Sequence, residues 1–387
     1  MSPERVPFYV PWVTNKDRKI VTDVLSSQWL TGGPLVTKFE RMFANYVHVK
    51  HAIAVSNCTA ALHLAMCALR IRPGDEVIVP VFTFAATANA VLYRGAKPVF
   101  CDIEPSTMNI SPEEIQNKIS ARTKGIVAVH YAGQPCDMSE IMEIAQHHGL
   151  FVVEDCAHSL GAAYASKQTG GIGVAGCFSF YPTKNITTME GGMLTTNDRG
   201  VAEKVRLLRG HAMTKTAFER DKQATWFYDI VDLGYNYRLN EAQAALGISQ
   251  LKRVDEANRK RIAAAKYYDR CLAEIPGIVV PSVKNKHVFH MYVVKVLTEE
   301  YGLSRDELFL NLTKRGIGLS VHYTPLHMLK YYRDTLGYQE GEFPVAERAY
   351  KEVLSLPLFP RITKQQIRLV SNAVREARAG KSGSGSS

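Results

Sequence analysis

Between residues 50 and 200, short runs of β-branched and apolar residues alternate with segments of helical periodicity. The runs HAIAVSN, EVIVPV, KPVFCDI and GIVAVHYA are each followed by a helical segment, and LFVVEDC, CFSFYP and GGMLTTN supply further strands. Strands separated by helices need crossover connections, so this order predicts an α/β fold with a mostly parallel, seven-stranded-type sheet flanked by helices. Because ligands of such sheets bind at the carboxyl ends of the strands, the same pattern predicts where a site should lie.

The chain after residue 200 predicts a smaller second unit. An irregular stretch at 212–228 precedes a long helical pattern from Asn240 to about Leu272, and Pro276-Gly277 ends that pattern. The strand-like run HVFHMYVVKV and the helical runs RDELFLNLTKRG and AERAYKEVL follow, as is typical of an α+β domain. We therefore expect a large domain over 1–250, a smaller C-terminal α+β domain over 251–380 reached by the long helix, and a flexible tail over 381–387.

The chain of 387 residues carries 47 Lys and Arg against 37 Asp and Glu, a formal net charge of +10. Its densest basic run, from Lys252 to Arg261, is interrupted by Asp255 and Glu256, so we expect a mixed-charge helix face and no nucleic-acid partner. The charge bears on function only if it lines a cleft for anionic small molecules. The N-terminus lacks the apolar core of a signal peptide, and no stretch reaches the roughly 18 apolar residues of a membrane span, which predicts a cytoplasmic protein with no membrane partner.

Two other patterns fail the requirements of the chemistry that they suggest. The seven cysteines form an odd set without a C-x-x-C pair, which predicts reduced, buried thiols and no metal site. Residues Gly171–Gly176 match G-x-G-x-x-G, but polar residues precede them and a strand-like run follows. A dinucleotide site needs a strand before this motif and a helix after it, so we expect no nicotinamide site here.

Three positions together have the chemistry of a cofactor site. Ser56–Leu62 joins a strand to a helix whose first N–H groups can bind an anion with help from the Thr59 hydroxyl, although Asn57 or Thr59 could also serve only as a helix cap. Asp155 ends an apolar run, where a carboxylate needs a cation or a capping role. Lys184 follows a strand, where desolvation would make it a nucleophile, although a loop lysine is more often solvated surface. A phosphate cradle, an acid that pairs with a pyridinium and a lysine that forms a Schiff base are what a pyridoxal phosphate site needs.

Four longer stretches are also distinctive: PVFTFAATANAVLYRGAKPVFCDI, VVEDCAHSLGA, FSFYPTKN and LGYNYRLNEAQAALG. With them, the chain from Trp29 to Pro360 closely resembles the sugar aminotransferases of the DegT/DnrJ/EryC1/StrS family, which have the pyridoxal-phosphate-dependent transferase fold type I. This resemblance implies a homodimer whose subunits share their active sites.

The resemblance also implies roles for individual residues. Lys184 would hold pyridoxal phosphate as a Schiff base and then move protons between cofactor and substrate. Asp155 would pair with the pyridine nitrogen, His158 would lie near the phenolic oxygen, and Phe84 would stack on the ring.

The remaining implied contacts concern the phosphate and the substrate. The phosphate would be bound by Thr59, by Ser179 and by the backbone N–H of Cys58, which stands where the family commonly has Gly, Ser or Ala, so that only a main-chain role is transferred. Asn236 would reach the phosphate of the neighbouring subunit's cofactor. The residues that would border the substrate are Tyr237, Arg238, His322 and Tyr323.

The implied reaction is a ping-pong transfer of an amino group from L-glutamate to a nucleotide-linked keto-sugar, for surface polysaccharide or protein glycosylation. The segments Arg209-Gly210-His211 and Asn236-Tyr237-Arg238 resemble enzymes that aminate C4 of a 4-keto-6-deoxyhexose more than those that act at C3. A C3 sugar aminotransferase, a cyclitol aminotransferase and a pyridoxal-phosphate-binding regulator are the alternatives. Sugar 3-dehydratases of the family have a histidine in place of the lysine, so Lys184 argues against that activity.

Overall fold

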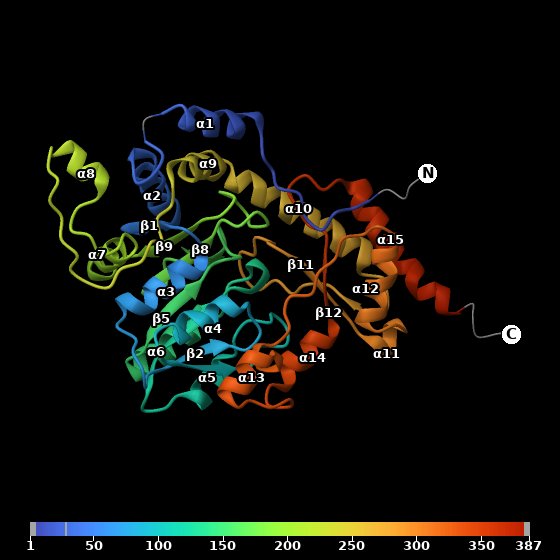
Figure 1. Ribbon diagram of the computed structural model, residues 1–387. Coiled ribbons are helices and arrows are strands. Elements are labelled where there is room, and N and C mark those ends of the chain that lie inside the picture. The colour runs from blue at the N-terminus through green and yellow to red at the C-terminus, as the bar shows by residue number, and fades with distance from the viewer. Residues whose placement is uncertain (1–4, 28, 383–387) are drawn as a thin grey trace.

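The central sheet has seven strands and carries the predicted ligand edge. It is seen in a computed structural model of the chain, of which residues 5–27 and 29–382 are described here. The spatial order is β1-β9-β8-β5-β4-β2-β3, and only β9 is antiparallel to its neighbours (Figure 1). The strands are β1 (His51–Val55), β2 (Glu76–Pro80), β3 (Lys97–Cys101), β4 (Thr123–Val129), β5 (Phe151–Asp155), β8 (Ala175–Ser179) and β9 (Gly192–Thr196). The predicted α/β class is confirmed, and each of the seven strand-like runs forms one of these strands.

Helices cover both faces of this sheet. One face packs against α3 (Cys58–Ala68), α4 (Ala85–Leu92) and α7 (Arg199–Leu208). The other face packs against α2 (Pro34–Val47) and α9 (Glu241–Leu251) near β1, and against α5 (Pro112–Lys118) and α6 (Met138–His148) near β3. Successive side chains of a strand point to opposite faces, so in β5 Val153 joins the core beneath α3 and Val152 the core beneath α6.

The C-terminal part has a sheet and a core of its own. Its strands β10 (Ile278–Val279), β11 (Tyr292–Val296) and β12 (Val353–Leu356) pair antiparallel and lie to one side of the large sheet (Figure 1). The helices of this part are α10 (Val254–Leu272), α11 (Thr298–Tyr301), α12 (Arg305–Lys314), α13 (Lys330–Leu336), α14 (Pro344–Glu352) and α15 (Lys364–Ser382). A smaller α+β unit is therefore present, whereas the predicted boundary between residues 250 and 251 stays a prediction.

Three local predictions differ from the structure. The single helix expected from Asn240 to Leu272 is wrong, because α9 ends at Leu251 and α10 starts at Val254, with Arg253 at φ −125° and ψ 13° between them. The stretch 212–228 contains a short helix, α8 (Ala217–Lys222), which starts with a capping box. Helix α15 continues to Ser382, into the predicted tail, whose residues 383–387 lie outside the described residues.

The N-terminal segment crosses from the C-terminal unit to the large sheet. Val6 forms a β-bridge with Ile317, and the hydroxyl of Tyr9 donates a hydrogen bond to the carbonyl of Lys184 at 3.3 Å. Helix α1 (Asn15–Leu25) then packs against α9. None of the helices within the described residues is long and apolar enough to cross a membrane, and the cytoplasmic location stays a prediction.

Buried Glu241 joins the start of α9 to the start of α2. Its carboxylate accepts hydrogen bonds from the N–H groups of Gly33, Leu35 and Val36 at 3.0, 2.9 and 3.1 Å. The first N–H groups of a helix have no acceptor within the helix, so this carboxylate replaces one.

We expect Glu241→Gln to lower the free energy of unfolding by about 1–3 kcal/mol, because the amide N–H₂ would face backbone donors in a buried site. Chemical denaturation of the variant measures this loss. Glu143→Gln, at an exposed position of α6, is the matched control and should stay within about 0.5 kcal/mol of the wild type. Equal stability of the two variants would contradict the capping role of Glu241.

Candidate active site

A cavity of about 460 Å³ opens where the carboxyl ends of β4, β5 and β8 meet the starts of α3 and α4. Nine of the twelve predicted site residues line it: Cys58, Thr59, Phe84, Asp155, His158, Ser179, Lys184, His322 and Tyr323. The other three, Asn236, Tyr237 and Arg238, are not among the lining residues of this chain's cavity. The topology thus brings together residues that are far apart in the sequence, at the edge that the strand pattern predicted.

The start of α3 forms one end of the cavity. Asn57 is the N-cap, and its side chain accepts a hydrogen bond from the N–H of Ala60 at 2.8 Å, so the capping alternative holds for Asn57. Cys58 and Thr59, in the first turn, line the cavity. A Cβ atom at Gly192 of β9 would lie 2.5 Å from the carbonyl carbon of Asn57 and 2.8 Å from the nitrogen of Cys58. A glycine at this position therefore lets β9 pass directly beneath the helix start, whose N–H groups and dipole favour an anion.

The carboxylate of Asp155 lies at the end of β5 and is almost inaccessible to water. It accepts hydrogen bonds from the N–H of Ala157 at 3.1 Å and from the hydroxyl of Thr87 at 2.9 Å. Burial raises the pKa of Asp155, while these two donors, with Lys184 and His130, act in the opposite direction. A buried carboxylate with two neutral donors can accept a further hydrogen bond from a cationic partner in the cavity.

Lys184 lies in the loop after β8, with its side chain against the same cavity. The N–H of Lys184 donates to the carbonyl of Tyr181 at 2.9 Å, and its own carbonyl accepts the Tyr9 hydroxyl. Burial lowers the pKa of the Lys184 amine to about 8, although Cys58 and Asp155 act to raise it. Near neutral pH a neutral, nucleophilic fraction of the amine is therefore available, unlike that of a solvated lysine.

Three imidazoles and a tyrosine form another part of the cavity wall: His158, His290, His322 and Tyr323. The Tyr323 hydroxyl and His158 Nε2 are 3.1 Å apart, and the ring of His158 stacks on that of His290 with centroids 4.5 Å apart. Burial is the main cause that lowers the pKa of all three histidines, to about 4 for His322, and the charge of Lys184 adds to this effect. These rings are therefore neutral hydrogen-bonding groups rather than cations.

His290 is a cavity residue that the sequence did not predict. It stands three residues after His287 in a strand-like run, and only its position in space distinguishes it from a core histidine. Its Nδ1 atom and that of His158 are buried without a hydrogen-bond partner. Unpartnered buried nitrogens in a cavity wall are available to a bound molecule.

Phe84 and Ser179 occupy the mouth and the strand end, respectively. The side chain of Phe84 is 61% exposed, and its ring centroid is 6.2 Å from that of Tyr323. An aromatic ring that is solvated at a cavity mouth can stack on a flat ligand. Ser179 is the last residue of β8, and its hydroxyl accepts a hydrogen bond from the N–H of Tyr181 at 3.4 Å.

The segment Asn236–Arg238 lies beside the carboxyl end of β1. Arg238 forms a bridge with Val55, Asn236 forms one with Gly210, and the ring of Tyr237 stacks on Tyr235. The segment is thus firmly placed without reaching the cavity of its own chain.

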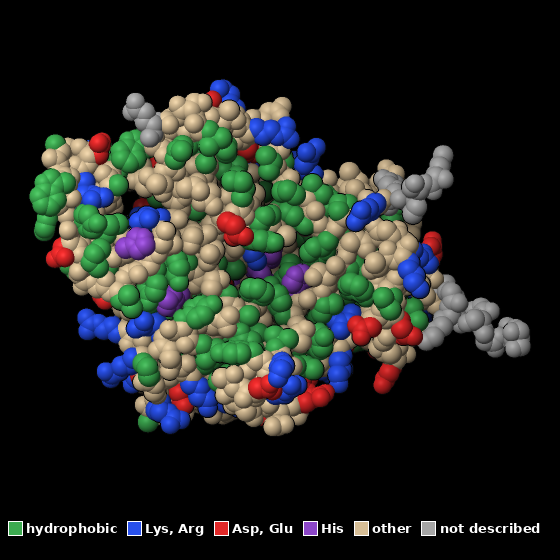
Figure 2. All heavy atoms as spheres, viewed as in Figure 1, with side chains coloured by type: hydrophobic (Ala, Val, Ile, Leu, Met, Phe, Trp, Pro, Cys, Tyr) green, Lys and Arg blue, Asp and Glu red, His purple; other side chains and the backbone are tan. Residues whose placement is uncertain are grey.

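The net charge of the protein does not collect at the cavity. The cavity lining has two carboxylates, Asp155 and Glu190, and a single cationic side chain, Lys184, and none of its described residues is an arginine. Figure 2 shows Lys and Arg scattered around the periphery of this face, with histidines nearer its centre. Within the described residues of one chain, the +10 charge therefore does not line this cavity.

A family model described as the DegT/DnrJ/EryC1/StrS aminotransferase family matches residues 12–375. The chain belongs to this family. It is therefore a pyridoxal-phosphate-dependent aminotransferase, as the resemblance of its motifs implied.

Individual relatives are similar over nearly the whole chain. The spore coat polysaccharide biosynthesis protein SpsC of Bacillus subtilis is 44% identical over 375 residues, 96% of this chain and 96% of that protein. Helicobacter pylori PseC, an aminotransferase involved in the biosynthesis of pseudoaminic acid, superposes with a TM-score of 0.90 and 32% identity, over 97% of this chain and 100% of that one. DesV of S. venezuelae superposes with a TM-score of 0.89 and 35% identity, over 97% and 98% of the two chains.

The cavity residues fit the family's cofactor. The helix start at Cys58 and Thr59 suits a phosphate, the buried Asp155 carboxylate suits a ring cation, and the Lys184 amine with its lowered pKa suits an aldehyde. The unpartnered Nδ1 of His158 leaves a polar atom for the same molecule.

We expect Lys184→Met to stabilise the cofactor-free protein at about pH 7 by roughly 1–3 kcal/mol, because a methionine avoids the burial of a charge. The pKa of Lys184 falls from 10.5 to about 8 on folding, so between these values the unfolded chain binds the extra proton and stability rises with pH. The advantage of the variant should therefore shrink from about pH 8 upward, as urea denaturation at several pH values would measure.

Lys167→Met, at an exposed position of β7 (Lys167–Gln168), is the control and should show no such pH-dependent difference. A Lys184→Met variant that is less stable than the wild type at neutral pH would contradict the lowered pKa.

Proposed function

We propose that this enzyme transfers an amino group from L-glutamate to the keto group of a nucleotide-linked sugar, and that it does so for polysaccharide or glycoconjugate synthesis. The observation that carries the proposal is the cavity in which a lysine with a pKa of about 8 and a buried carboxylate face a helix start. The names of SpsC and PseC, which refer to polysaccharide and pseudoaminic acid biosynthesis, support a sugar as the acceptor.

Within the proposal, amination takes place at C4 of a 4-keto-6-deoxyhexose. The support is the resemblance of Arg209-Gly210-His211 and Asn236-Tyr237-Arg238 to C4 enzymes, and the structure joins these segments through the Gly210–Asn236 bridge and a hydrogen bond from the N–H of Tyr237 to the carbonyl of Arg209 at 2.9 Å. A C3 sugar or a cyclitol as acceptor is the alternative that a substrate assay would reveal.

Lys184 and Asp155 carry the chemistry in this proposal. Bound pyridoxal phosphate supplies the electron sink that stabilises the charge left when a proton leaves the substrate carbon. The Lys184 amine holds the cofactor and, once released, accepts that proton and returns it to the cofactor side, which its pKa of about 8 permits near neutral pH. Asp155 keeps a proton on the ring nitrogen through its carboxylate, which Thr87 and Ala157 hold in place.

The other cavity residues bind and orient. Thr59, Ser179 and the backbone N–H of Cys58 would hold the phosphate, and Phe84 would stack on the ring. His158, fixed by the Tyr323 hydroxyl, presents its free nitrogen to the phenolic oxygen.

We assign the substrate side of the cavity to His322 and Tyr323, and in the partner copy to Tyr237 and Arg238. The backbone carbonyl of His322 accepts the hydroxyl of Tyr131 at 2.5 Å, and its ring bonds Ser355 through Nδ1 at 2.8 Å, so the ring position is set from two sides. Neutral rings suit sugar hydroxyl groups, which both donate and accept hydrogen bonds.

The proposed functional unit is a homodimer in which Asn236 reaches the cofactor phosphate of the partner subunit. One supporting observation is that Asn236 does not line the cavity of its own chain. A second is the exposed apolar surface formed by 226–233, where Trp226 is 85% and Leu233 is 78% exposed. Apolar surface of this kind marks a contact with another protein chain.

The purified holoenzyme is expected to show a visible absorbance band of lysine-bound pyridoxal phosphate that disappears when L-glutamate is added. Lys184→Ala should lack that band, because no other amine lines the cavity among the described residues. Absorbance spectra before and after glutamate measure both effects. A band that persists with glutamate, or that is unchanged in Lys184→Ala, would overturn the aminotransferase proposal, and the first of these outcomes would favour a regulator.

The acceptor is tested in the reverse half-reaction with a panel of nucleotide-linked amino-sugars. The proposal expects 4-amino-4,6-dideoxyhexoses to restore the band faster than 3-amino isomers or amino-cyclitols. A preference for either of the latter would replace the C4 assignment.

Subunit sharing is tested by mixing two impaired variants. A heterodimer of Asn236→Ala with Lys184→Ala contains one site with both native residues, so random mixing should restore roughly a quarter of the wild-type activity. The mixture is unfolded and refolded together, and the separately refolded variants are the control. Activity no higher than the average of the two variants would show that Asn236 does not act across the interface.

A further inference from the structure

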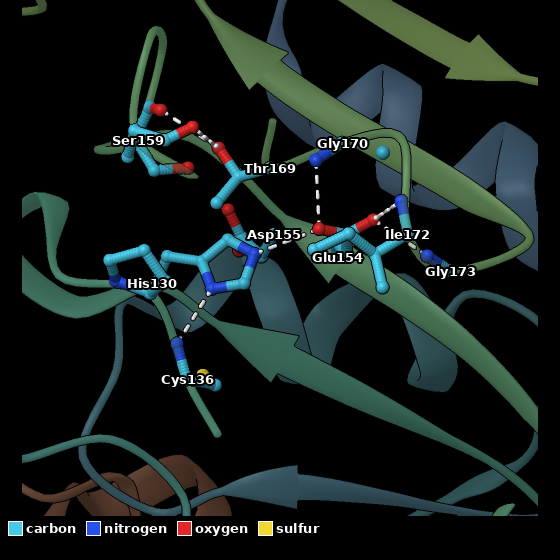
Figure 3. A network of polar contacts seen from close by, with 12 residues as sticks. His130, Cys136, Glu154, Asp155, Ser159, Thr169, Gly170, Ile172 and Gly173 are labelled. Carbon is cyan, nitrogen blue, oxygen red and sulfur yellow. Dashed lines mark hydrogen bonds and ion pairs between the residues drawn. The ribbon is translucent and has the colours of Figure 1, made fainter. Parts of the chain in front are cut away.

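Glu154, one residue before Asp155, is a fully buried carboxylate on the opposite face of β5. Its Oε1 atom accepts hydrogen bonds from the N–H groups of Ile172 and Gly173 at 2.8 and 2.7 Å, and Oε2 accepts that of Gly170 at 2.7 Å (Figure 3). The glycine-rich loop 170–173, which overlaps the G-x-G-x-x-G motif of residues 171–176, therefore binds an anion that belongs to the protein itself.

His130, just after β4, completes this site. The N–H of Cys136 donates to its Nδ1 at 3.1 Å, so Nδ1 carries no proton, and Nε2 donates its proton to Glu154 Oε2 at 3.0 Å. The backbone N–H of His130 also donates to the carbonyl of Asp155 at 3.2 Å. His130 thus holds Glu154 by its side chain and Asp155 by its backbone.

The close approach of the loop depends on its glycines. Gly170 has a φ of +84°, and a Cβ atom there would lie 2.3 Å from the ring of Phe178. A Cβ atom at Gly173 would lie 2.4 Å from the carbonyl oxygen of Val152 in β5. Gly170 and Gly173 therefore allow the loop to contact two strands, β8 and β5, without any bound nucleotide.

A metal ion is not the natural occupant of this cluster. His130, Glu154 and Cys156 have ligand atoms within 4.8 Å of one another. However, Oε1 of Glu154 accepts the N–H groups of Ile172 and Gly173, and Oε2 accepts those of Gly170 and of His130 Nε2. Four donors directed at one carboxylate satisfy it without a cation.

The cluster joins the elements that deliver the cavity residues. Val129 and Asp155 line the cavity at the ends of β4 and β5, Ser179 does so at the end of β8, and the loop 170–173 directly precedes β8. Glu154 is opposite Ala128 in β4 and Gly176 in β8, so its contacts hold all three strands on the face away from the cavity.

We propose that Glu154 is a positioning residue, which acts through His130 and the loop 170–173 to hold the Asp155 carboxylate where it meets the cofactor ring. This inference rests on the proposed pairing of Asp155 with the ring nitrogen. In Glu154→Gln the side-chain shape is kept, but the amide N–H₂ faces two N–H donors, and His130 cannot change tautomer without losing the bond from Cys136.

The test is a pH titration of the absorbance band of the Glu154→Gln holoenzyme, together with its affinity for pyridoxal phosphate. The position of the band depends on whether the nitrogen that joins Lys184 to the cofactor carries a proton. A protonated ring nitrogen lowers the pKa of that nitrogen. If Asp155 is displaced and the ring nitrogen loses its proton, the midpoint of the pH titration should therefore rise by about half a pH unit or more. Pyridoxal phosphate should also bind about tenfold more weakly.

The matched control is Glu347→Gln. Glu347 also accepts hydrogen bonds from a histidine, His327 Nε2 at 2.9 Å, and from the loop N–H groups of Gly341 and Phe343 at 2.7 and 3.4 Å, but it does not line the cavity. This variant should lose thermal stability with an unchanged midpoint and an unchanged affinity. If Glu154→Gln behaves in the same way, Glu154 is structural only and the proposal is overturned.

A third variant, Asp155→Asn, separates the two proposals. If it leaves the midpoint in place, the assigned role of Asp155 is wrong; if it shifts the midpoint and Glu154→Gln does not, only the inference about Glu154 fails. Should Glu154→Gln not fold, His130→Gln disturbs one donor of the same cluster and should raise the midpoint by a smaller amount. An unchanged midpoint in His130→Gln would then overturn the inference.

Discussion

The burial of two groups that would be charged in water, Lys184 and Asp155, is the constraint on which the rest of the site depends. Burial lowers the pKa of the first to about 8 and raises that of the second, so each would be costly to hold on its own. The surroundings reduce this cost with oriented dipoles rather than water. The Thr87 hydroxyl and the N–H of Ala157 donate hydrogen bonds to the Asp155 carboxylate. The dipole at the start of α3 favours a bound anion. The cavity therefore suits a ligand with a cationic group next to Asp155 and an anionic group at the start of α3.

The two acids at the end of β5, Glu154 and Asp155, point to opposite faces of the strand and have different partners there. Asp155 points to the cavity beneath α3 and α4, while Glu154 points to the loop before β8 and to His130. A strand with alternate faces is suited to this arrangement, because a rigid contact on one side fixes the direction of the next side chain on the other. The same logic appears at Gly192, where the absence of a side chain on β9 leaves room for the helix start above it.

Much of this could be predicted from the sequence, because the informative signals are local. The seven strands follow from their β-branched runs. Asp155 ends β5, Thr59 lies in the first turn of the helix after β1, and Lys184 lies in the loop after β8, so all three are found near one edge of the sheet. The break at Arg253 was missed, because helical periodicity continues on both sides of it. His290 and Glu154 were missed as functional candidates since their meaning lies in partners that the fold supplies, a stacked His158 and three loop N–H groups. For Glu154 the sequence did contain a signal. A second acid stands beside Asp155, and a glycine motif occurs without the strand and helix that a nucleotide site needs, so the acid could have been predicted as the partner of that loop.

The path of the N-terminal segment has a consequence for the order in which the molecule is completed. Val6 is fixed by Ile317 and Tyr9 touches Lys184, while Phe8 stacks on His322 with ring centroids 5.8 Å apart. Val6 and Phe8 thus meet partners that are made more than three hundred positions later, and the wall around the lysine is complete only then. Since domains fold from the N-terminus as they emerge, the large sheet can form early, but the cofactor pocket is complete only after Ile317 and His322 have left the ribosome.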